Sequence, residues 1–342
     1  MCSGFVPWAT DKALSSRCHH ARKRACVRRA TRPPAMLAIP RVVVGTARLG
    51  SVLPAALVLK SQSDDTLRQL DGLVEAGCTA FDLAASYQLG GTERLFGEWL
   101  ALRRHRDRLL LISKGAHPYP VVRPNRLQSS AIAADLDATL RRLRTDRVDL
   151  YLLHRDFPGA PLEPMVQTLR NALQAGKILA WGVSNWTHAR IQAIDQVARQ
   201  AGLPAMAASS PHFSVFDWTR APWTGSVSIA GSANREARDF YQKSQLHVLA
   251  WGPLGSGFLL SDRHGSGIYR NAANLAKRRR LQAIAAEHGA TTAQVALAYL
   301  FHQPFPVSAV VAASTVEKVR SNLAATAIHL SRSEMESLDG AA

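Results

Sequence analysis

The sequence lacks any long hydrophobic run and contains little cysteine. No apolar run reaches the roughly 20 residues that a membrane-spanning helix needs, so we expect a soluble protein without membrane attachment. Of the four cysteines, Cys2, Cys18 and Cys26 lie close to the N-terminus, and only Cys78 belongs to the rest of the chain. We therefore expect no disulfide framework and a reducing, cytoplasmic location.

Acidic residues are nearly absent from the first 35 positions. These carry eight Lys/Arg residues and one Asp, a net +7 of the chain's formal +17, and show no helical or strand periodicity. The composition is compatible with a transit peptide; the alternative is an over-long gene start, with the true start at Met36. In either case we expect residues 1–35 to be a disordered extension and residues 36–342 to form one domain.

The sequence also lacks the patterns of several ligand-binding classes. The remaining charge of +10 favours an anionic ligand such as a nucleotide phosphate, but no basic helix or aromatic–basic platform indicates nucleic acid. Cys18-His19-His20 with Cys26 matches no common zinc spacing, so we expect no metal site. The run from Gly45 to Gly50 is neither a G-x-G-x-x-G turn nor a P-loop, which argues against a doubly wound open sheet.

What the chain does contain is a repeated unit, an apolar β-type run followed by an amphipathic helix pattern. The predicted strands are Val42–Ala47, Ala80–Ala85, Leu109–Lys114, Val148–His154, Ala180–Ser184, Ala205–Ser210, His247–Trp251 and Ala309–Ala313. The predicted helices are 64–76, 92–104, 128–143, 163–175, 188–201, 234–244, 291–302 and 316–324. Eight alternating units in one domain predict an α/β fold of the (β/α)8 TIM-barrel type.

Capping boxes and loop lengths add detail to this barrel. Thr291 with Gln294 and Ser331 with Glu334 fit the capping-box pattern, and the second pair predicts an extra C-terminal helix. Long loops are expected after the sixth strand, at 211–233, and after the seventh, at 252–275. Binding sites of barrels are built from loops at this end of the strands.

Four polar residues lie at the carboxyl ends of three consecutive predicted strands. Asp82 and Tyr87 lie at the second strand, Lys114 at the third and His154 at the fourth. Because these strand ends meet at one mouth of a barrel, we expect the four side chains to gather there. A buried acid needs a cation, which Lys114 supplies to Asp82. The same cation would lower the pKa of Tyr87, making it a general acid near neutral pH, and His154 would hydrogen-bond a carbonyl oxygen.

These residues indicate reduction of a carbonyl compound, and two other functions stay open. Lys114 could instead form a Schiff base with a carbonyl substrate, as in a lyase. The barrel could also serve as a non-catalytic partner protein that senses NADPH.

Several ordered motifs resemble the aldo-keto reductases, which are NAD(P)H-dependent (β/α)8 barrels. The resemblance covers about residues 40 to 340 and rests on Gly45-Thr46, Asp82 to Tyr87, Lys114, Val148 to His154, Gly176 to Asn185, Pro253 to Gly257, Ala293 to Leu297 and Ala313 to Asn322. It implies that Asp82, Tyr87, Lys114 and His154 form the catalytic tetrad of an oxidoreductase, with Tyr87 as the proton donor.

The same resemblance implies a cofactor site. Ser184 and Asn185 would bind the nicotinamide amide, Trp251 would stack on its ring, and Ser210 stands where Gln is common in the family. The other predicted cofactor residues are Gly45, Thr46, Pro253, Leu254, Gly255, Gly257, Ser314, Lys318 and Asn322. A cation at Lys318 suits a 2′-phosphate, so NADP is favoured over NAD.

The substrate pocket would be lined by aromatic residues of the loops over the mouth: Tyr119, Trp186, Phe213, Trp218 and Trp223. With Arg155 and His212 nearby, such a pocket could take a sugar or an aromatic aldehyde. We expect a small carbonyl compound as the only class of partner, and a monomer or small homo-oligomer.

Overall fold

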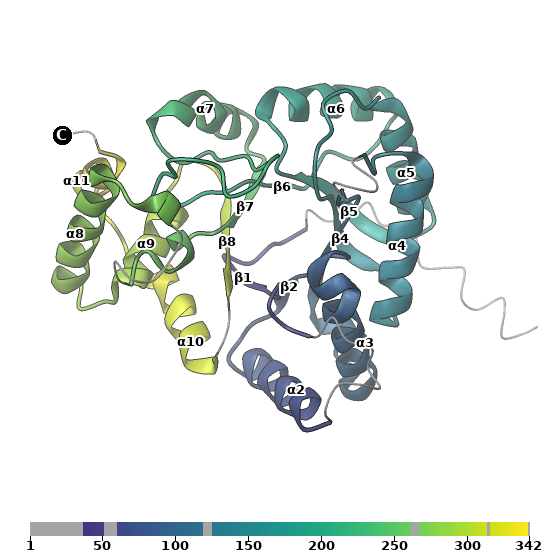
Figure 1. Ribbon diagram of the computed structural model, residues 1–342, viewed down its shortest axis with the longest axis horizontal. Coiled ribbons are helices and arrows are strands. Elements are labelled where there is room, and N and C mark those ends of the chain that lie inside the picture. The colour runs from purple at the N-terminus through teal and green to yellow at the C-terminus, as the bar shows by residue number, and fades with distance from the viewer. Residues whose placement is uncertain (1–36, 51–59, 119–124, 261–266, 313–314, 341–342) are drawn as a thin grey trace, which may run out of the picture. The chain divides into compact units, whose positions relative to one another are not determined.

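The computed structural model describes residues 37–50, 60–118, 125–260, 267–312 and 315–340, all within the unit Leu37–Ala342. Eight parallel strands follow one another in chain order around a closed barrel, with helices on its outside (Figure 1). The strands are β1 (Val42–Gly45), β2 (Ala80–Asp82), β3 (Leu110–Gly115), β4 (Val148–Leu153), β5 (Ile178–Ser184), β6 (Ala208–Ser210), β7 (His247–Trp251) and β8 (Val307–Ala312). Pairing of β1 with β8, in register at Val43 and Val310, closes the barrel and confirms the predicted fold.

The helices confirm all eight predicted positions and the extra C-terminal helix. They are α2 (Lys60–Glu75), α3 (Gly91–Arg103), α4 (Ser129–Leu143), α5 (Glu163–Gln174), α6 (His188–Gln200), α7 (Arg235–Ser244), α8 (Ala272–Glu287), α9 (Thr292–Phe301), α10 (Val316–Ala324) and α11 (Arg332–Asp339). Both predicted capping boxes are formed, at Thr291 and Gln294 and at Ser331 and Glu334.

Helix α8 was not predicted. Its amphipathic pattern is interrupted by the run Lys277-Arg-Arg-Arg280, although Leu281 and Ile284 are buried. The basic residues are used locally: Lys277 Nζ donates to the Val215 carbonyl at 3.0 Å, and Arg280 Nη1 to the Ser337 carbonyl at 2.7 Å. Charged side chains that bond to neighbouring backbone stabilise a helix that its hydrophobic pattern alone does not reveal.

The strands have two apolar faces because successive side chains point to opposite sides. The inner cluster, which fills the barrel, contains Val43, Ala80, Ile112, Leu150, Leu152, Ala208 and Leu249. The outer cluster, between strands and helices, contains their neighbours, such as Leu111 and Leu153. The inward-facing residues Ala80, Ile112 and Leu152 are each followed two positions later by a polar residue, namely Asp82, Lys114 and His154. Because side chains on a strand alternate between its two sides, these polar residues also point toward the barrel interior, at the carboxyl ends of the strands.

Two further features concern the chain outside the mouth. Within the described ranges no helix is both long enough and apolar enough to cross a membrane. Cys78, just before β2, is 1% exposed, and its backbone N–H donates to the Leu73 carbonyl at 3.0 Å. Burial raises the pKa of the Cys78 thiol to about 11.

Candidate active site

The carboxyl ends of β2, β3 and β4 are joined by backbone hydrogen bonds. The Ala85 N–H donates to the Lys114 carbonyl at 2.8 Å, and the His154 N–H donates to the Gly115 carbonyl at 2.8 Å. Thr46, just after β1, donates through its hydroxyl to the Asp82 carbonyl at 2.8 Å. These bonds fix the strand ends that carry the predicted catalytic residues relative to one another.

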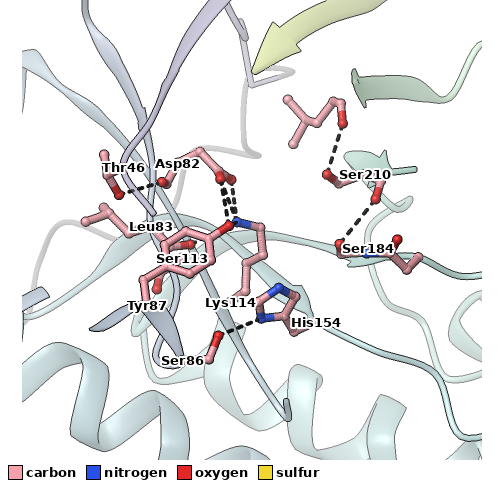
Figure 2. Close-up of polar contacts among 12 residues, drawn as sticks. Thr46, Asp82, Leu83, Ser86, Tyr87, Ser113, Lys114, His154, Ser184 and Ser210 are labelled. Carbon is pink, nitrogen blue, oxygen red and sulfur yellow. Dashed lines mark hydrogen bonds and ion pairs between the residues drawn. The ribbon is translucent and has the colours of Figure 1, made fainter. Parts of the chain in front are cut away.

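Lys114 lies at the centre of this group and is 3% exposed. Its Nζ lies 2.6 Å from Asp82 Oδ1 and donates to Asp82 Oδ2 at 2.7 Å. The same nitrogen donates to the Tyr87 hydroxyl oxygen at 2.9 Å and to the Leu83 carbonyl at 3.1 Å (Figure 2). The buried ammonium thus has the counter-ion that a desolvated charge requires, and the phenol is a second hydrogen-bond partner.

Tyr87 reaches Lys114 from a strained 3₁₀ turn, Tyr87–Gly90. Gln88 and Leu89 both have positive φ, 47° and 52°, and the turn ends at Gly90, where φ is 80°. The tyrosine ring lies against the lysine, with Nζ 4.7 Å from the ring centroid, and the hydroxyl donates to Asp82 Oδ2 at 3.3 Å. Strained backbone held by its surroundings is common at functional sites because it fixes a side chain in one place.

The predicted direction of the Tyr87 pKa was wrong. Burial raises the pKa of the Tyr87 phenol, the negative charge of Asp82 raises it further, and Lys114 only partly offsets both. Burial alone would lower the pKa of Lys114, but Asp82 and Tyr87 outweigh burial and raise it. At neutral pH the site therefore holds a protonated phenol beside a protonated amine.

His154 is a neutral imidazole beside this pair. Burial lowers its pKa well below the usual range, and the charges of Lys114 and other nearby cations lower it further. Ser86 Oγ lies 3.4 Å from His154 Nδ1, and the Tyr87 ring packs edge-on against the imidazole, with centroids 6.0 Å apart. His117, which the sequence did not single out, packs on His154 with ring centroids 4.8 Å apart. The sequence feature that could have identified His117 is its position three residues after Lys114.

A second buried polar cluster lies on the outer side of β3 and is centred on Glu93, which is 0% exposed. Its Oε1 accepts from Ser113 Oγ and from Thr139 Oγ1, both at 2.8 Å. Its Oε2 accepts from Arg142 Nε at 2.6 Å and lies 2.6 Å from Arg142 Nη2. Glu93 lies in the first turn of α3, and Ser113 directly precedes Lys114 on β3. This cluster therefore connects the helix that follows Tyr87 with the strand that carries Lys114.

The predicted nicotinamide residues lie together at the ends of β5, β6 and β7. Ser184 Oγ donates to the Ser210 carbonyl at 3.2 Å, and Asn185 Nδ2 donates to Ser184 Oγ at 2.9 Å. Trp251 Nε1 donates to Asn185 Oδ1 at 3.1 Å. Figure 2 shows Ser184 and Ser210 beside each other and apart from the Lys114 group. Asn185 has a φ of 58°, in the left-handed region.

The loop after β7 is a tight turn with several positive φ values. Leu254 has φ −105° and ψ 19°, and Gly255 follows with φ 62°; the Gly255 N–H donates to the Gly252 carbonyl at 3.0 Å, inside the turn. Pro253 and Gly257 flank this pair, and Gly257 also has positive φ, 92°. Gly45 ends β1 and pairs with Asp82 on β2, and Thr46 follows β1.

Helix α10 carries the two remaining predicted cofactor residues. Lys318 and Asn322 lie one turn apart and therefore share one face. Lys318 is exposed, whereas Asn322 is buried. Ser314 and the predicted pocket residue Tyr119 lie outside the described residues, as does the predicted extension 1–35.

The aromatic residues predicted to line the pocket divide into two groups. Trp223 is half exposed and stacks on Trp251, with centroids 5.4 Å apart and an interplanar angle of 19°. Trp218 is tilted against the same indole at 5.8 Å. Phe213 is instead 1% exposed and packs against Tyr299 and Phe305 in the core, so its prediction as a substrate contact is corrected.

Trp186 is also corrected. It is fully buried, with the Arg190 guanidinium 5.6 Å from its ring, and it lines a cavity of about 200 Å³ between α6 and α7. His212 is 0% exposed and is held by Ser228 Oγ and the Tyr269 hydroxyl, each at 2.9 Å. Burial lowers the pKa of His212 to about 3, so it is a neutral core residue.

In the part of the chain that the structure describes, no group of three or more His, Cys, Asp or Glu side chains is arranged to hold a metal ion. The chemistry available at the mouth is that of an ammonium, a phenol and a neutral imidazole.

Comparison with known proteins places this geometry in a family. The family model described as the aldo/keto reductase family matches residues 41–342. Methylglyoxal reductase YeaE of Escherichia coli is 31% identical over 288 residues, covering 82% of this chain and 86% of the relative. Norsolorinic acid reductase stcV of Emericella nidulans is 28% identical over 283 residues, covering 79% and 70%.

Among solved structures, an aldo/keto reductase from Klebsiella pneumoniae in complex with NADP and acetate is 26% identical, with a TM-score of 0.68, and covers 89% of this chain and 92% of that one. The match to the family model extends over nearly the whole described barrel, and the mouth carries an Asp, a Tyr, a Lys and a His in contact or stacked on one another. The chain therefore belongs to the aldo/keto reductase family of oxidoreductases.

Proposed function

We propose that residues 36–342 form a reductase that converts an aldehyde or ketone to an alcohol, with Tyr87 as the proton donor. The observation that carries this proposal is the contact of Lys114 Nζ with both the Asp82 carboxylate and the Tyr87 hydroxyl. This arrangement holds a protonated phenol at a fixed point in the mouth.

In this mechanism each residue has a defined task. Bound nicotinamide cofactor would supply the hydride. His154, neutral and 6% exposed, donates a hydrogen bond to the carbonyl oxygen and orients it. Tyr87 gives its proton to the same oxygen, and the Lys114 ammonium stabilises the phenolate left behind. Asp82 keeps the lysine charged and in place.

The site gives less support to a Schiff-base lyase. A Schiff base requires an unprotonated amine, whereas Asp82 and Tyr87 raise the pKa of Lys114 and occupy its nitrogen. Borohydride trapping of a carbonyl compound on Lys114 is the corresponding control experiment, and we expect no adduct.

For the cofactor we propose NADPH over NADH. The exposed cation of Lys318 lies one turn from Asn322 on α10, where a 2′-phosphate would gain a charged partner. The NADP complex of the Klebsiella pneumoniae relative supports the same choice. We expect Lys318→Ala to raise KM for NADPH about tenfold and to leave KM for NADH unchanged.

The test of the proposed function is Tyr87→Phe. Removing the hydroxyl removes the proton donor, so turnover of a carbonyl panel should fall about 10²- to 10⁴-fold. NADPH affinity, measured by the change in cofactor fluorescence on binding, should stay within about threefold because the Tyr87 hydroxyl bonds to Lys114 and Asp82. A variant that turns over like the wild type would refute the assignment.

A further inference from the structure

Arg155 follows His154 at the end of β4 and is 8% exposed. Its guanidinium carbon lies 5.4 Å from the centroid of the Trp223 ring, and Nη1 donates to the Gly225 carbonyl at 3.2 Å. Trp223 stacks in turn on Trp251 at the end of β7. Arg155, Trp223 and Trp251 therefore form a column that crosses the mouth from β4 to β7.

Arg155 has no acidic counter-ion within the described ranges. Asp82 is paired with Lys114, and Asp156 is 3.3 Å from Arg190 Nε. Asp135, the acid near the end of β3, is paired with Arg126.

The titratable groups that face Arg155 do not balance its charge either. His117 and His154 both have pKa values below the usual range, mainly because of burial, and are neutral. Burial lowers the pKa of Arg155 to about 10, which still leaves the guanidinium charged at neutral pH. With Lys114 neutralised by Asp82, Arg155 stays a buried cation without an acidic partner among the described residues of the mouth.

A buried charge without a counter-ion is costly, and an anion that enters the mouth would remove that cost. We propose that Arg155 binds a carboxylate of the substrate, so that the carbonyl compounds reduced most efficiently also carry a carboxylate. The guanidinium suits this ligand because it can donate two parallel hydrogen bonds to a carboxylate, and only Nη1 is used by Gly225. Trp223 would form a flat wall beside the bound acid. This inference rests on the proposed function and deepens it by naming a substrate class.

The test compares two substrates that differ in charge, 4-formylbenzoate and methyl 4-formylbenzoate, in the NADPH-dependent reduction. We expect the wild type to favour the acid in kcat/KM by at least about tenfold, since a charge-assisted bidentate pair has this magnitude. Arg155→Met should abolish the preference, and Arg155→Lys should give an intermediate ratio. Arg199→Met, which alters an exposed cation on α6, is the matched control and should keep the wild-type ratio.

A purely structural role of Arg155 predicts a different result. If it only held the loop at Gly225, Arg155→Met would slow both substrates equally and the ratio would not change, which would overturn the proposal. Thermal unfolding of each variant shows whether the barrel is intact, and Arg155→Lys supplies a second folded variant if Arg155→Met unfolds.

A binding measurement separates this inference from the proposed reaction. Terephthalamate and terephthalamide have the same shape and differ by one negative charge, and neither needs turnover. Terephthalamate should quench tryptophan fluorescence in the wild type, through Trp223, with a Kd at least about tenfold lower than in Arg155→Met. Equal binding in the two proteins would overturn the inference even in an active reductase. Arg155-dependent binding without any carbonyl turnover would support the carboxylate site and refute the reductase instead.

Discussion

Two buried carboxylates lie on opposite sides of β3 and differ in how they are satisfied. Glu93, on the outside, accepts four contacts from Ser113, Thr139 and Arg142, and every donor belongs to a packed element. Asp82, on the inside, holds Lys114, whose nitrogen also contacts the hydroxyl of Tyr87. The outer network is closed, whereas the inner one ends in the phenol that we propose as the proton donor.

The difference shows how one strand serves stability and chemistry together. Ser113 and Lys114 are neighbours in sequence, and the period of the strand sends one to Glu93 and the other to Asp82. The outer carboxylate fixes the strand, and the inner one tunes a lysine. Variants on the two sides should therefore separate loss of stability from loss of turnover.

The largest effect is expected for Lys114→Met. Turnover should fall about 10²- to 10⁴-fold because the phenolate of Tyr87 loses its stabilising cation. The free energy of unfolding should fall by about 3–5 kcal/mol because Asp82 is left buried without its cation. The double variant Asp82→Asn, Lys114→Met should regain much of this stability in denaturant titrations and none of the turnover. Equal recovery of both properties would contradict the assignment of roles.

Glu93→Gln should instead lower stability with little loss of turnover. We expect the free energy of unfolding to fall by about 1–3 kcal/mol, because Arg142 loses its counter-ion and a donor is left unmatched. Turnover should stay within about tenfold of the wild type at a temperature where the variant is folded. Glu336→Gln, in the exposed pair with Arg332, is the control and should cost less than about 0.5 kcal/mol. A severe loss of turnover in stable Glu93→Gln would show that the two networks are not separate.

The pH dependence of reduction tests the inner network alone. Because burial and Asp82 raise the pKa of Tyr87, the phenol keeps its proton at neutral pH, and kcat/KM should decline only above pH 10. Asp82→Asn removes a charge that disfavours the phenolate, so the alkaline limb should move to lower pH. A wild-type limb below pH 9 would mean that Lys114 dominates after all.

The smallest effect is expected at the opposite end of the barrel, where His247 begins β7 and its Nε2 lies 2.7 Å from Ser308 Oγ. Burial lowers the pKa of His247 to about 4, so the unfolded chain binds a proton that the folded chain does not between about pH 6.5 and 4. The contribution of neutral His247 to the free energy of unfolding should therefore be complete above pH 6.5. It should decrease by roughly 2 kcal/mol as the pH drops to 4.

His247→Gln should flatten that part of the stability curve, measured by denaturant titration at several pH values. His329→Gln, at an exposed position, should leave the curve unchanged. Turnover at pH 7 should be unaffected by either variant, since the amino ends of barrel strands support stability and their carboxyl ends carry the site.

The sequence predicted the barrel and the grouping of Asp82, Tyr87, Lys114 and His154 because both follow from local periodicity. The strand pattern gives the direction of each side chain, and a closed parallel sheet gathers the strand ends. It did not predict the direction of the Tyr87 pKa, since that depends on how deeply the phenol is buried.

Two of the remaining misses, at Phe213 and Glu93, originate in long-range packing. Phe213 turns toward Tyr299, a residue far along the chain, and nothing near Phe213 indicates that choice. Glu93 reads as an ordinary residue of a helix start, and its burial depends on donors from β3 and α4. Helix α8 was missed because its basic run hides the apolar face.

The buried thiol of Cys78 gives this barrel a built-in probe of local opening. A thiol with a pKa of about 11 and 1% exposure reacts with iodoacetamide only when the segment between α2 and β2 opens. The alkylation rate, followed by peptide mass spectrometry apart from Cys2, Cys18 and Cys26, therefore measures the free energy of that opening. Because β2 ends at Asp82, a ligand bound in the mouth should slow the reaction in proportion to its saturation, which reports occupancy without any turnover.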